Sequence, residues 1–522
     1  MIPAGYGNIA IGGGSLYYNN NRDGNTAVGL SSLALNCFTS GGASILPSQG
    51  LHNTALGSET LFNNRRGSGA VAIGYKAAYS DTAADGVVAI GRAALFNNNG
   101  KIRNLAIGDS ALYNNSTGAN ESEGIDNLAV GTKALFSNTK GINNIAIGAG
   151  TLKLNTTGSF NTAIGVANLF NNNGNSNTAI GSSSLFTNST GSDNTAIGVQ
   201  SLVNSFSGNS NTALGFRTLS NNISGNSNVA IGTNALAKNT AKSNLVAVGD
   251  SALYNNGIGA GVLQAVGNTA VGSKSLFSNT TGSYNTSLGL GTLNNHAFGD
   301  DNTAVGASAL AIGSTGTSTT AVGKSALQYD NGTNNVALGA YTMFYHQTGN
   351  DNVAIGSSAL FNNINGNGNI AIGGSAALNE SGSNKLYIEN SNADKNNALI
   401  YGDFAADSLN LNARVNIRDY TRLGTQASGA PAIKMKELTI QSSSSSTGQV
   451  SINHGLTSSK IISVTVLLEW TTGYLVPPEY SPDPLLNYNY FVSPTQITIQ
   501  NNAASCAYIC SKPVKILVTY KE

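Results

Sequence analysis

The sequence predicts an all-β fold in which a long parallel β-solenoid is followed by a small, β-rich C-terminal domain. Three observations support this prediction: a tripeptide motif that recurs at a nearly fixed spacing, the small residues inside the motif, and the gathering of proline near the C-terminus. Internal repetition takes precedence over the several globular domains that a chain of 522 residues would otherwise suggest.

The motif Ala-(Ile/Val/Leu)-Gly occurs in 21 copies, one of which has Ser287 in place of alanine, and their glycines run from Gly12 to Gly373. The usual step is 17 residues, with two steps of 16, two of 23 and one of 28. The extra residues, near 43–50, 119–124 and 258–263, are expected to form outward loops on a fixed coil. A leucine usually follows four positions after the glycine, so each coil is expected to contain two short strands and two corners.

Alternation along an extended strand assigns each motif residue to one of two faces. Ala163 and Gly165 face one way, whereas Ile164 faces the other. The Ala/Gly face suits a thin interior, and Leu169-type residues can join the aliphatic row around the corner. This row forms a stripe that a soluble monomer rarely exposes, which predicts self-association about an axis parallel to the shaft. The candidates for the intersubunit core are Ile107, Ile147, Ile164, Ile180, Ile197, Ile231, Ile355 and Ile372.

Asparagine also occupies fixed positions in the coil. It stands four residues before the motif glycine in 17 of 21 copies, and an Asn-rich turn follows the leucine. Asparagine tolerates left-handed backbone conformations at corners, and identical amides stacked coil on coil can hydrogen-bond as ladders. We therefore predict a structural role for these residues. Stacking at about 4.8 Å per coil gives a shaft of roughly 100 Å.

Proline marks the predicted domain boundary. Only Pro3 and Pro47 of the nine prolines precede residue 430, and strands that are paired on both edges cannot spare a backbone donor. We therefore expect a solenoid shaft over residues 1–382, a neck over 383–430 and a C-terminal β-sandwich tip over 431–522.

The Asn-x-Ala-Ile-Gly repeat, with the Ser/Ala-Leu pair that follows and the Asn-Thr-Thr-Gly turns at 155–158 and 279–282, resembles the head repeats of trimeric autotransporter adhesins. It also resembles the shafts of phage-type tail fibres and of fibres on contractile injection systems. The resemblance implies that three left-handed β-rolls pack about a threefold axis over residues 8 to about 380. It thus implies a homotrimeric parallel β-solenoid (β-roll) shaft whose trimer core contains the isoleucines named above, although a 17-residue coil is longer than those of the adhesin heads.

The C-terminal part is more similar to fibre proteins than to adhesins. It shows neither coiled-coil heptads nor the alternating strands of a membrane barrel before Lys521 and Glu522. The stretches 386–417 and 454–520 resemble the neck and tip modules of phage or injection-system fibres. The resemblance therefore favours a tail fibre.

Residues that could carry enzyme chemistry show no recurring arrangement. Charged side chains make up 10% of the chain and lie on variable positions, and a net charge of +1 gives no basis for nucleic-acid binding. Asp-Asn turns at 300–302 and 351–352 lack a full set of calcium ligands, and no apolar run of about 18 residues predicts membrane insertion. We therefore expect no catalytic residue, cofactor or metal site. The four histidines, which show no metal-ligand spacing, are His52, His296, His346 and His454.

One segment has the composition of a recognition site, because aromatic residues gather there among prolines. Rigid aromatic side chains with a polar tip suit stacking on sugar rings or docking on a protein. In the alternative interpretation, Trp470 and Phe491 fill the core of the tip and the tyrosines brace a long loop. The receptor-binding candidates are Trp470, Tyr474, Tyr480, Tyr488 and Tyr490.

The expected function is that of a non-catalytic, trimeric tail fibre or adhesin that binds a host or target-cell surface through its tip. The expected partners are further copies of the chain, a cell-surface glycan or protein receptor, and a baseplate or other fibre protein, in a virion tail or an extracellular injection-system fibre. Two alternatives stay open at this point: a bacterial surface adhesin or spacer anchored by another protein, and a tailspike-like polysaccharide depolymerase. An acyltransferase built on hexapeptide coils is disfavoured, because each coil offers only two spaced apolar residues and then polar ones.

Overall fold

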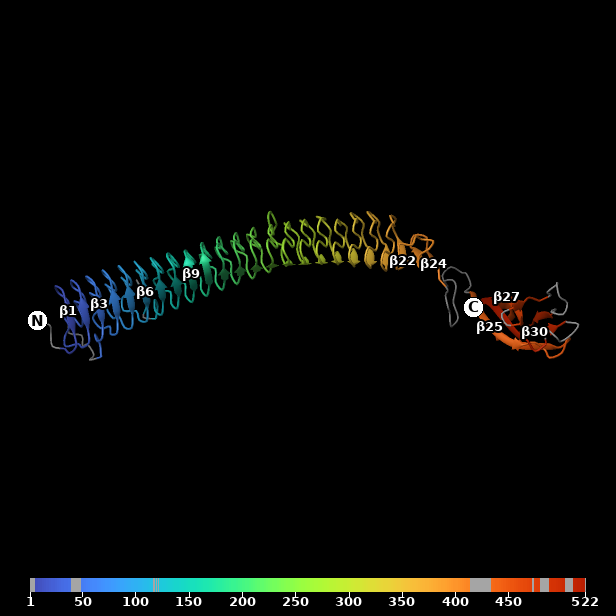
Figure 1. The fold of residues 1–522 in the computed structure, drawn as a ribbon, viewed down its shortest axis with the longest axis horizontal. Helices are drawn as coiled ribbons and strands as arrows, with labels where there is room; N and C mark the ends of the chain where they lie inside the picture. The colour runs from blue at the N-terminus through green and yellow to red at the C-terminus, as the bar shows by residue number, and fades with distance from the viewer. Residues whose placement is uncertain are drawn as a thin grey trace. The chain divides into compact units, whose positions relative to one another are not determined.

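A computed structural model describes residues 5–38, 48–115, 118, 120, 122–413, 433–471, 474–478, 488–502 and 510–521. The chain divides into two compact units, Met1–Ala413 and Arg414–Glu522. Figure 1 shows the stacked coils of the first unit, coloured from blue at β1 to orange at β22 and β24.

The first unit is a parallel β-solenoid of about 22 turns with a 17-residue period, which confirms this part of the predicted fold. Its strands form one sheet of 24, in which only the last pairings, β22 with β23 and β23 with β24, are antiparallel. The strands are β1 (Ile9–Ile11), β2 (Thr26–Val28), β3 (Thr54–Leu56), β4 (Val71–Ile73), β5 (Val88–Ile90), β6 (Leu105–Ile107), β7 (Leu128–Val130), β8 (Ile145–Ile147), β9 (Thr162–Val166), β10 (Thr178–Ser182), β11 (Thr195–Ile197), β12 (Thr212–Leu214), β13 (Val229–Ile231), β14 (Val246–Val248), β15 (Thr269–Val271), β16 (Thr286–Leu288), β17 (Thr303–Val305), β18 (Thr320–Val322), β19 (Val336–Leu338), β20 (Val353–Ile355), β21 (Ile370–Ile372), β22 (Lys385–Ile388), β23 (Ile400–Asp403) and β24 (Ser408–Leu411).

Each coil contributes one strand to this sheet, and the rest of the coil consists of turns and bends. The expectation of two strands per coil is therefore wrong. Successive strands pair in register, so that Ala163 of β9 lies beside Ala179 of β10. Tyr387 of β22 takes the position of the alanine and lies beside Ala371, so the parallel ladder continues one coil beyond the end of the sequence repeat.

Alanine and leucine form the apolar interior of the coils. Ala163 and Leu169 are both fully buried, and the equivalent residues are buried along the solenoid. The leucine reaches the interior from a left-handed backbone conformation, with φ of 48° at Leu169. Leu169-type residues therefore do not join the outer aliphatic row, contrary to expectation. Further left-handed corners directly precede the positions of the ladder asparagines, and some of these hold asparagine as expected, such as Asn143 and Asn244, although the ladder residue Asn161 itself is not left-handed.

Two ladders of buried asparagines confirm that stacked amides hydrogen-bond from coil to coil. In the first ladder, the backbone N–H of Asn161 donates to Asn144 Oδ1 at 3.0 Å, and Asn161 Nδ2 donates to the carbonyl of Gly174 at 3.0 Å. In the second ladder, Asn155 Nδ2 donates to Asn138 Oδ1 at 3.0 Å and also to a turn carbonyl of its own coil. Because the amides bond turn backbone groups inside the coil, they offset the cost of burying those groups.

The motif glycine lies where consecutive coils approach each other closely. Gly181 has a φ of 137°, a conformation that side-chain-bearing residues rarely adopt. A Cβ atom added to Gly181 would lie 2.7 Å from the carbonyl oxygen of Gly198 in the next coil. Both the dihedral angle and the contact therefore require glycine at this position.

The second unit contains two antiparallel sheets that share one apolar core. The sheets have the strand orders β25-β31-β27-β28 and β26-β30-β29. Val466, Leu468 and Ile516 of the first sheet pack with Ile497 and Ile499 of the second. The elements are β25 (Ile433–Gln441), β26 (Gln449–Asn453), the 3-10 helix η2 (Ser458–Lys460), β27 (Ile461–Thr471), β28 (Tyr474–Val476), β29 (Tyr488–Val492), β30 (Gln496–Asn501) and β31 (Pro513–Lys521).

We expect the substitution Gly181→Ala to destabilise the solenoid by about 1–3 kcal/mol, because it combines an unfavourable φ with a contact against the next coil. Thermal unfolding followed by circular dichroism measures the effect. Gly259→Ala is the matched control, since Gly259 also has a positive φ, of 72°, but open space around its added Cβ. Equal losses in the two variants would contradict the role given to the contact between coils.

Candidate functional site

The outer surface of the solenoid sheet is uniformly aliphatic or threonine. In strands β1 to β21 the first and third residues lie on the outer side, and both columns contain only Thr, Val, Leu and Ile. The central residue between them is buried in every strand except β1. We call these two columns the aliphatic face. The isoleucines predicted from the sequence all lie in its second column: Ile107, Ile147, Ile164, Ile180, Ile197, Ile231, Ile355 and Ile372.

These isoleucines are partly open to solvent in the single chain. The exposed fraction is 36% for Ile107, 37% for Ile164 and 38% for Ile372. The first column, which was not predicted from the sequence, adds residues such as Val229 and Ile145 to the same surface. Strand alternation could have revealed it, because residues two apart in a strand share a face. The result is a continuous aliphatic second column beside a first column that mixes threonine with aliphatic residues.

Two ion pairs border the aliphatic face in the coils of β5 to β7. Just after β5 and β6, Arg92 Nη2 lies 2.7 Å from Asp109 Oδ2. Just before β6 and β7, Arg103 Nε lies 2.6 Å from Asp126 Oδ1, and this hydrogen bond lowers the pKa of the Asp126 carboxyl. An apolar centre with a polar rim is the usual anatomy of a protein–protein interface.

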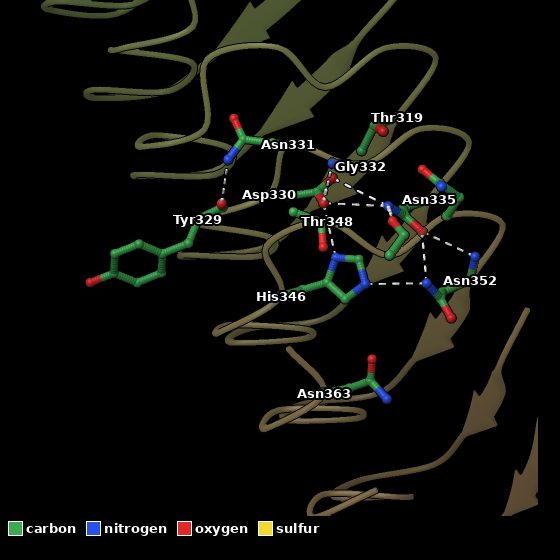
Figure 2. A network of polar contacts seen from close by, with 12 residues as sticks. Thr319, Tyr329, Asp330, Asn331, Gly332, Asn335, His346, Thr348, Asn352 and Asn363 are labelled. Atoms are coloured by element: carbon green, nitrogen blue, oxygen red, sulfur yellow. Dashed lines mark hydrogen bonds and ion pairs between the residues drawn. The ribbon is translucent and has the colours of Figure 1, made fainter. Parts of the chain in front are cut away.

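A buried histidine and carboxylate meet inside the solenoid. Asp330 and His346 replace asparagine on the second ladder, and neither has any exposed side-chain surface. His346 Nδ1 lies 2.9 Å from Asp330 Oδ1, and Asn352 Nδ2 lies 3.2 Å from His346 Nε2 (Figure 2). Asp330 Oδ1 also accepts from the backbone N–H of Gly332 at 2.9 Å, and Asn335 Nδ2 lies 3.4 Å from both carboxylate oxygens.

The hydrogen bonds of this network are those of a structural cluster and not those of a general base. A general base must come within hydrogen-bond reach of the proton that it removes from a substrate. Both ring nitrogens of His346 and both oxygens of Asp330 have partners inside the coil instead. We therefore assign His346 and Asp330 to coil stacking, as variants of the asparagine ladder.

Two further histidines, His296 and His454, are also buried. His296 lies on the same ladder, with Nδ1 3.2 Å from the carbonyl of Gly313 and Nε2 2.9 Å from both the carbonyl of Gly316 and Asn302 Nδ2. Burial lowers the pKa of His296. His454 is fully buried in the second unit, and its Nε2 lies 3.1 Å from the carbonyl of Ser493. In the described parts of the chain, no group of three His, Cys, Asp or Glu residues could hold a metal ion.

The structure places Tyr488 in the core of the second unit. Its side chain is fully buried, and its hydroxyl donates to the carbonyls of Val466 at 2.9 Å and Val476 at 2.8 Å. Since β29 belongs to one sheet and the two valines belong to the other, Tyr488 joins the sheets. Burial raises the pKa of this hydroxyl. The expectation that Tyr488 contacts a receptor is therefore wrong.

The structure describes the side chains of only some of the other aromatic candidates. Tyr490 is partly buried, and its hydroxyl donates to the carbonyl of Val464 at 2.7 Å. Phe491 is 53% exposed, so the alternative that it fills the core is wrong. The side chains of Trp470 and Tyr474, and all of Tyr480, lie outside the described residues, and their receptor role stays a prediction.

Comparison with protein-family models, curated proteins and solved structures finds no match to this chain. Within the residues that the structure describes, no helix is long and apolar enough to cross a membrane.

Acid is expected to destabilise the solenoid in part through His296. Its pKa in the folded chain lies below its ordinary value of 6.5, so the unfolded chain takes up a proton at a higher pH than the folded chain does. The contribution of His296 to stability is therefore complete above about pH 6.5 and decreases as the pH falls below that value. His296→Asn restores the usual ladder residue and should show a smaller fall in melting temperature between about pH 7.5 and about pH 5 than the parent protein.

The parent protein and His296→Asn share every other titrating group, so the difference between their melting-temperature responses reports on His296. Asp81, whose pKa is raised to about 6 by burial, contributes with the opposite sign but is present in both. His52→Asn is the control, because His52 is exposed and should leave the pH response unchanged. An identical response of the parent protein and His296→Asn would refute the assignment.

Proposed function

We propose that the protein is a homotrimeric fibre whose solenoid shaft projects a C-terminal β-sandwich, and that it attaches to a host or target-cell surface without catalysis. The aliphatic face is the observation that carries this proposal. It extends over all strands from β1 to β21 and is partly exposed in a single chain. Burying such a surface contributes about 25 cal/mol per Å² of apolar area, so association is favoured.

Further copies of this chain are the partner that best matches the aliphatic face. The face repeats with the coil spacing of about 4.8 Å over roughly 100 Å, and a second solenoid of the same kind offers the same repeat. A surface with a different repeat would fall out of register with the aliphatic face within a few coils. Three faces gathered about one axis would enclose an aliphatic core and leave the turns outside, in keeping with the resemblance to trimeric adhesin heads and tail-fibre shafts.

The second unit supports a binding role at one end of the fibre. Two antiparallel sheets with a common core fit a β-sandwich, and Phe491 presents an exposed aromatic ring on β29. The candidates Trp470, Tyr474, Tyr480 and Tyr490 keep their proposed receptor role. Three such units on one fibre would increase avidity through multivalency. Cys510 is disulfide-bonded, which fits an oxidising, extracellular setting such as a virion tail or injection-system fibre.

Placing charges on the aliphatic face should prevent assembly. In the double variant Ile164→Asp and Ile180→Asp, two neighbouring carboxylates would have to be buried without a partner. Sedimentation equilibrium should show a trimer for the parent chain and a monomer for the variant. Asn175→Asp, at an exposed turn, is the control and should remain a trimer. A parent chain that is monomeric at micromolar concentration would rule out the proposed fibre.

Removing residues 431–522 should leave a rod that no longer attaches firmly to cells. We expect binding to target cells to fall by at least about a hundredfold, because the three tips and their avidity are lost together. Flow cytometry with labelled protein measures binding, and electron microscopy checks that the rod persists. A rod that binds cells as well as the full chain does would place the receptor site on the shaft.

A further inference from the structure

A column of aromatic rings runs along the turns of the solenoid. The rings stand at the fifth position after the motif glycine, and neighbouring rings in the longest run stack with centroids 5.0 to 5.3 Å apart. Shorter stacks follow, Phe170 with Phe186 and Tyr254 with Phe277. The longest run contains Phe62, Tyr79, Phe96, Tyr113 and Phe136.

The column is interrupted between Phe186 and Tyr254, where the same position holds Val203, Ser220 and Ala237. The missing rings leave a groove with a volume of about 440 Å³. Three coils without a ring correspond to a length of roughly 14 Å at the coil spacing. None of the residues that line the groove belongs to a strand, so the groove lies outside the aliphatic face.

Amide side chains line this groove. Asn204 Nδ2 donates to Asn221 Oδ1 at 3.0 Å, and Asn221 Nδ2 donates to the carbonyl of Ala237 at 3.0 Å. These bonds hold the amides in place. Each amide retains capacity for further hydrogen bonds, because it offers two donors and an acceptor with two lone pairs. Mixed donors and acceptors of this kind match the hydroxyl groups of a sugar.

Two cations border the same groove, and neither forms an ion pair with any described residue. Arg217 Nε donates to Gln200 Oε1 at 2.8 Å, and the guanidinium carbon lies 5.0 Å from the centre of the Phe216 ring. Lys238 Nζ lies 5.1 Å from the centre of the Tyr254 ring, which closes one end of the groove. The lining contains no carboxylate, so the groove favours a negatively charged ligand.

We propose that this groove binds an acidic oligosaccharide, with Arg217 and Lys238 contacting its carboxylate or sulfate groups and the amides contacting its hydroxyl groups. An acidic peptide fits less well, because the lining offers neither a free strand edge nor an apolar pocket for a side chain. The site lies on the shaft, and its existence does not depend on receptor binding by the C-terminal unit.

The substitution Ser220→Phe tests the groove without changing its charge. Phenylalanine occupies this position in other coils, so the variant should fold normally while its ring fills the gap in the column. Isothermal titration calorimetry on the full chain would use a carboxylated oligogalacturonate, a sulfated heparin tetrasaccharide and uncharged maltotetraose. We expect at least one acidic probe to bind about tenfold more tightly than maltotetraose, and Ser220→Phe to abolish that binding.

A charge-removing variant and a matched control complete the test. Arg217→Ala with Lys238→Ala should weaken binding about tenfold or more. Lys133→Ala with Lys274→Ala should leave binding unchanged, because these exposed lysines share the turn position of Arg217 but lie outside the groove. The proposal fails if no acidic probe binds, if Ser220→Phe keeps the parent affinity, if the control pair weakens binding equally, or if polyglutamate binds as tightly as the sugars. Circular dichroism checks that every variant is folded.

Discussion

Hydrogen bonds between buried asparagine amides and turn backbone are the interaction on which the solenoid depends. Only one short segment of each coil is a strand, so most backbone groups lie in turns. Without Asn161, the backbone N–H of Asn177 would lose its acceptor inside the coil. A buried polar group without a partner costs about 1–3 kcal/mol, and the same arrangement recurs from coil to coil. The few substitutions on the second ladder, such as His296, Asp330 and His346, keep polar partners for this reason.

The narrow interior that these ladders create explains why the larger aliphatic residues lie outside. A typical coil buries one small residue from its strand and one leucine from its left-handed corner, as Ala163 and Leu169 illustrate. The strand residues on either side of the alanine are left on the outer face. A single chain therefore buries only part of its apolar surface, and association of the faces would complete the burial. This links the coil geometry directly to the proposed fibre.

The turn positions that face solvent are free to differ between coils, because neither ladder passes through them. Some coils carry stacked aromatic rings there, and others carry small or polar residues. The groove near Ser220 arises from three consecutive coils that lack a ring. Such a regular scaffold can acquire a local site through surface substitutions alone, without any change in its stacking.

The sequence by itself determined the solenoid, its period and the asparagine ladders, because these follow from a local pattern repeated along the chain. Only the tertiary structure decided where Leu169-type residues and Tyr488 lie. A left-handed corner turns the leucine inward, and this dihedral angle has no signature in hydrophobic alternation. Tyr488 is buried because its hydroxyl meets carbonyls from a second sheet, a contact between strands distant in sequence. The groove likewise depends on which side chains stack across coils, which the linear order of residues does not display.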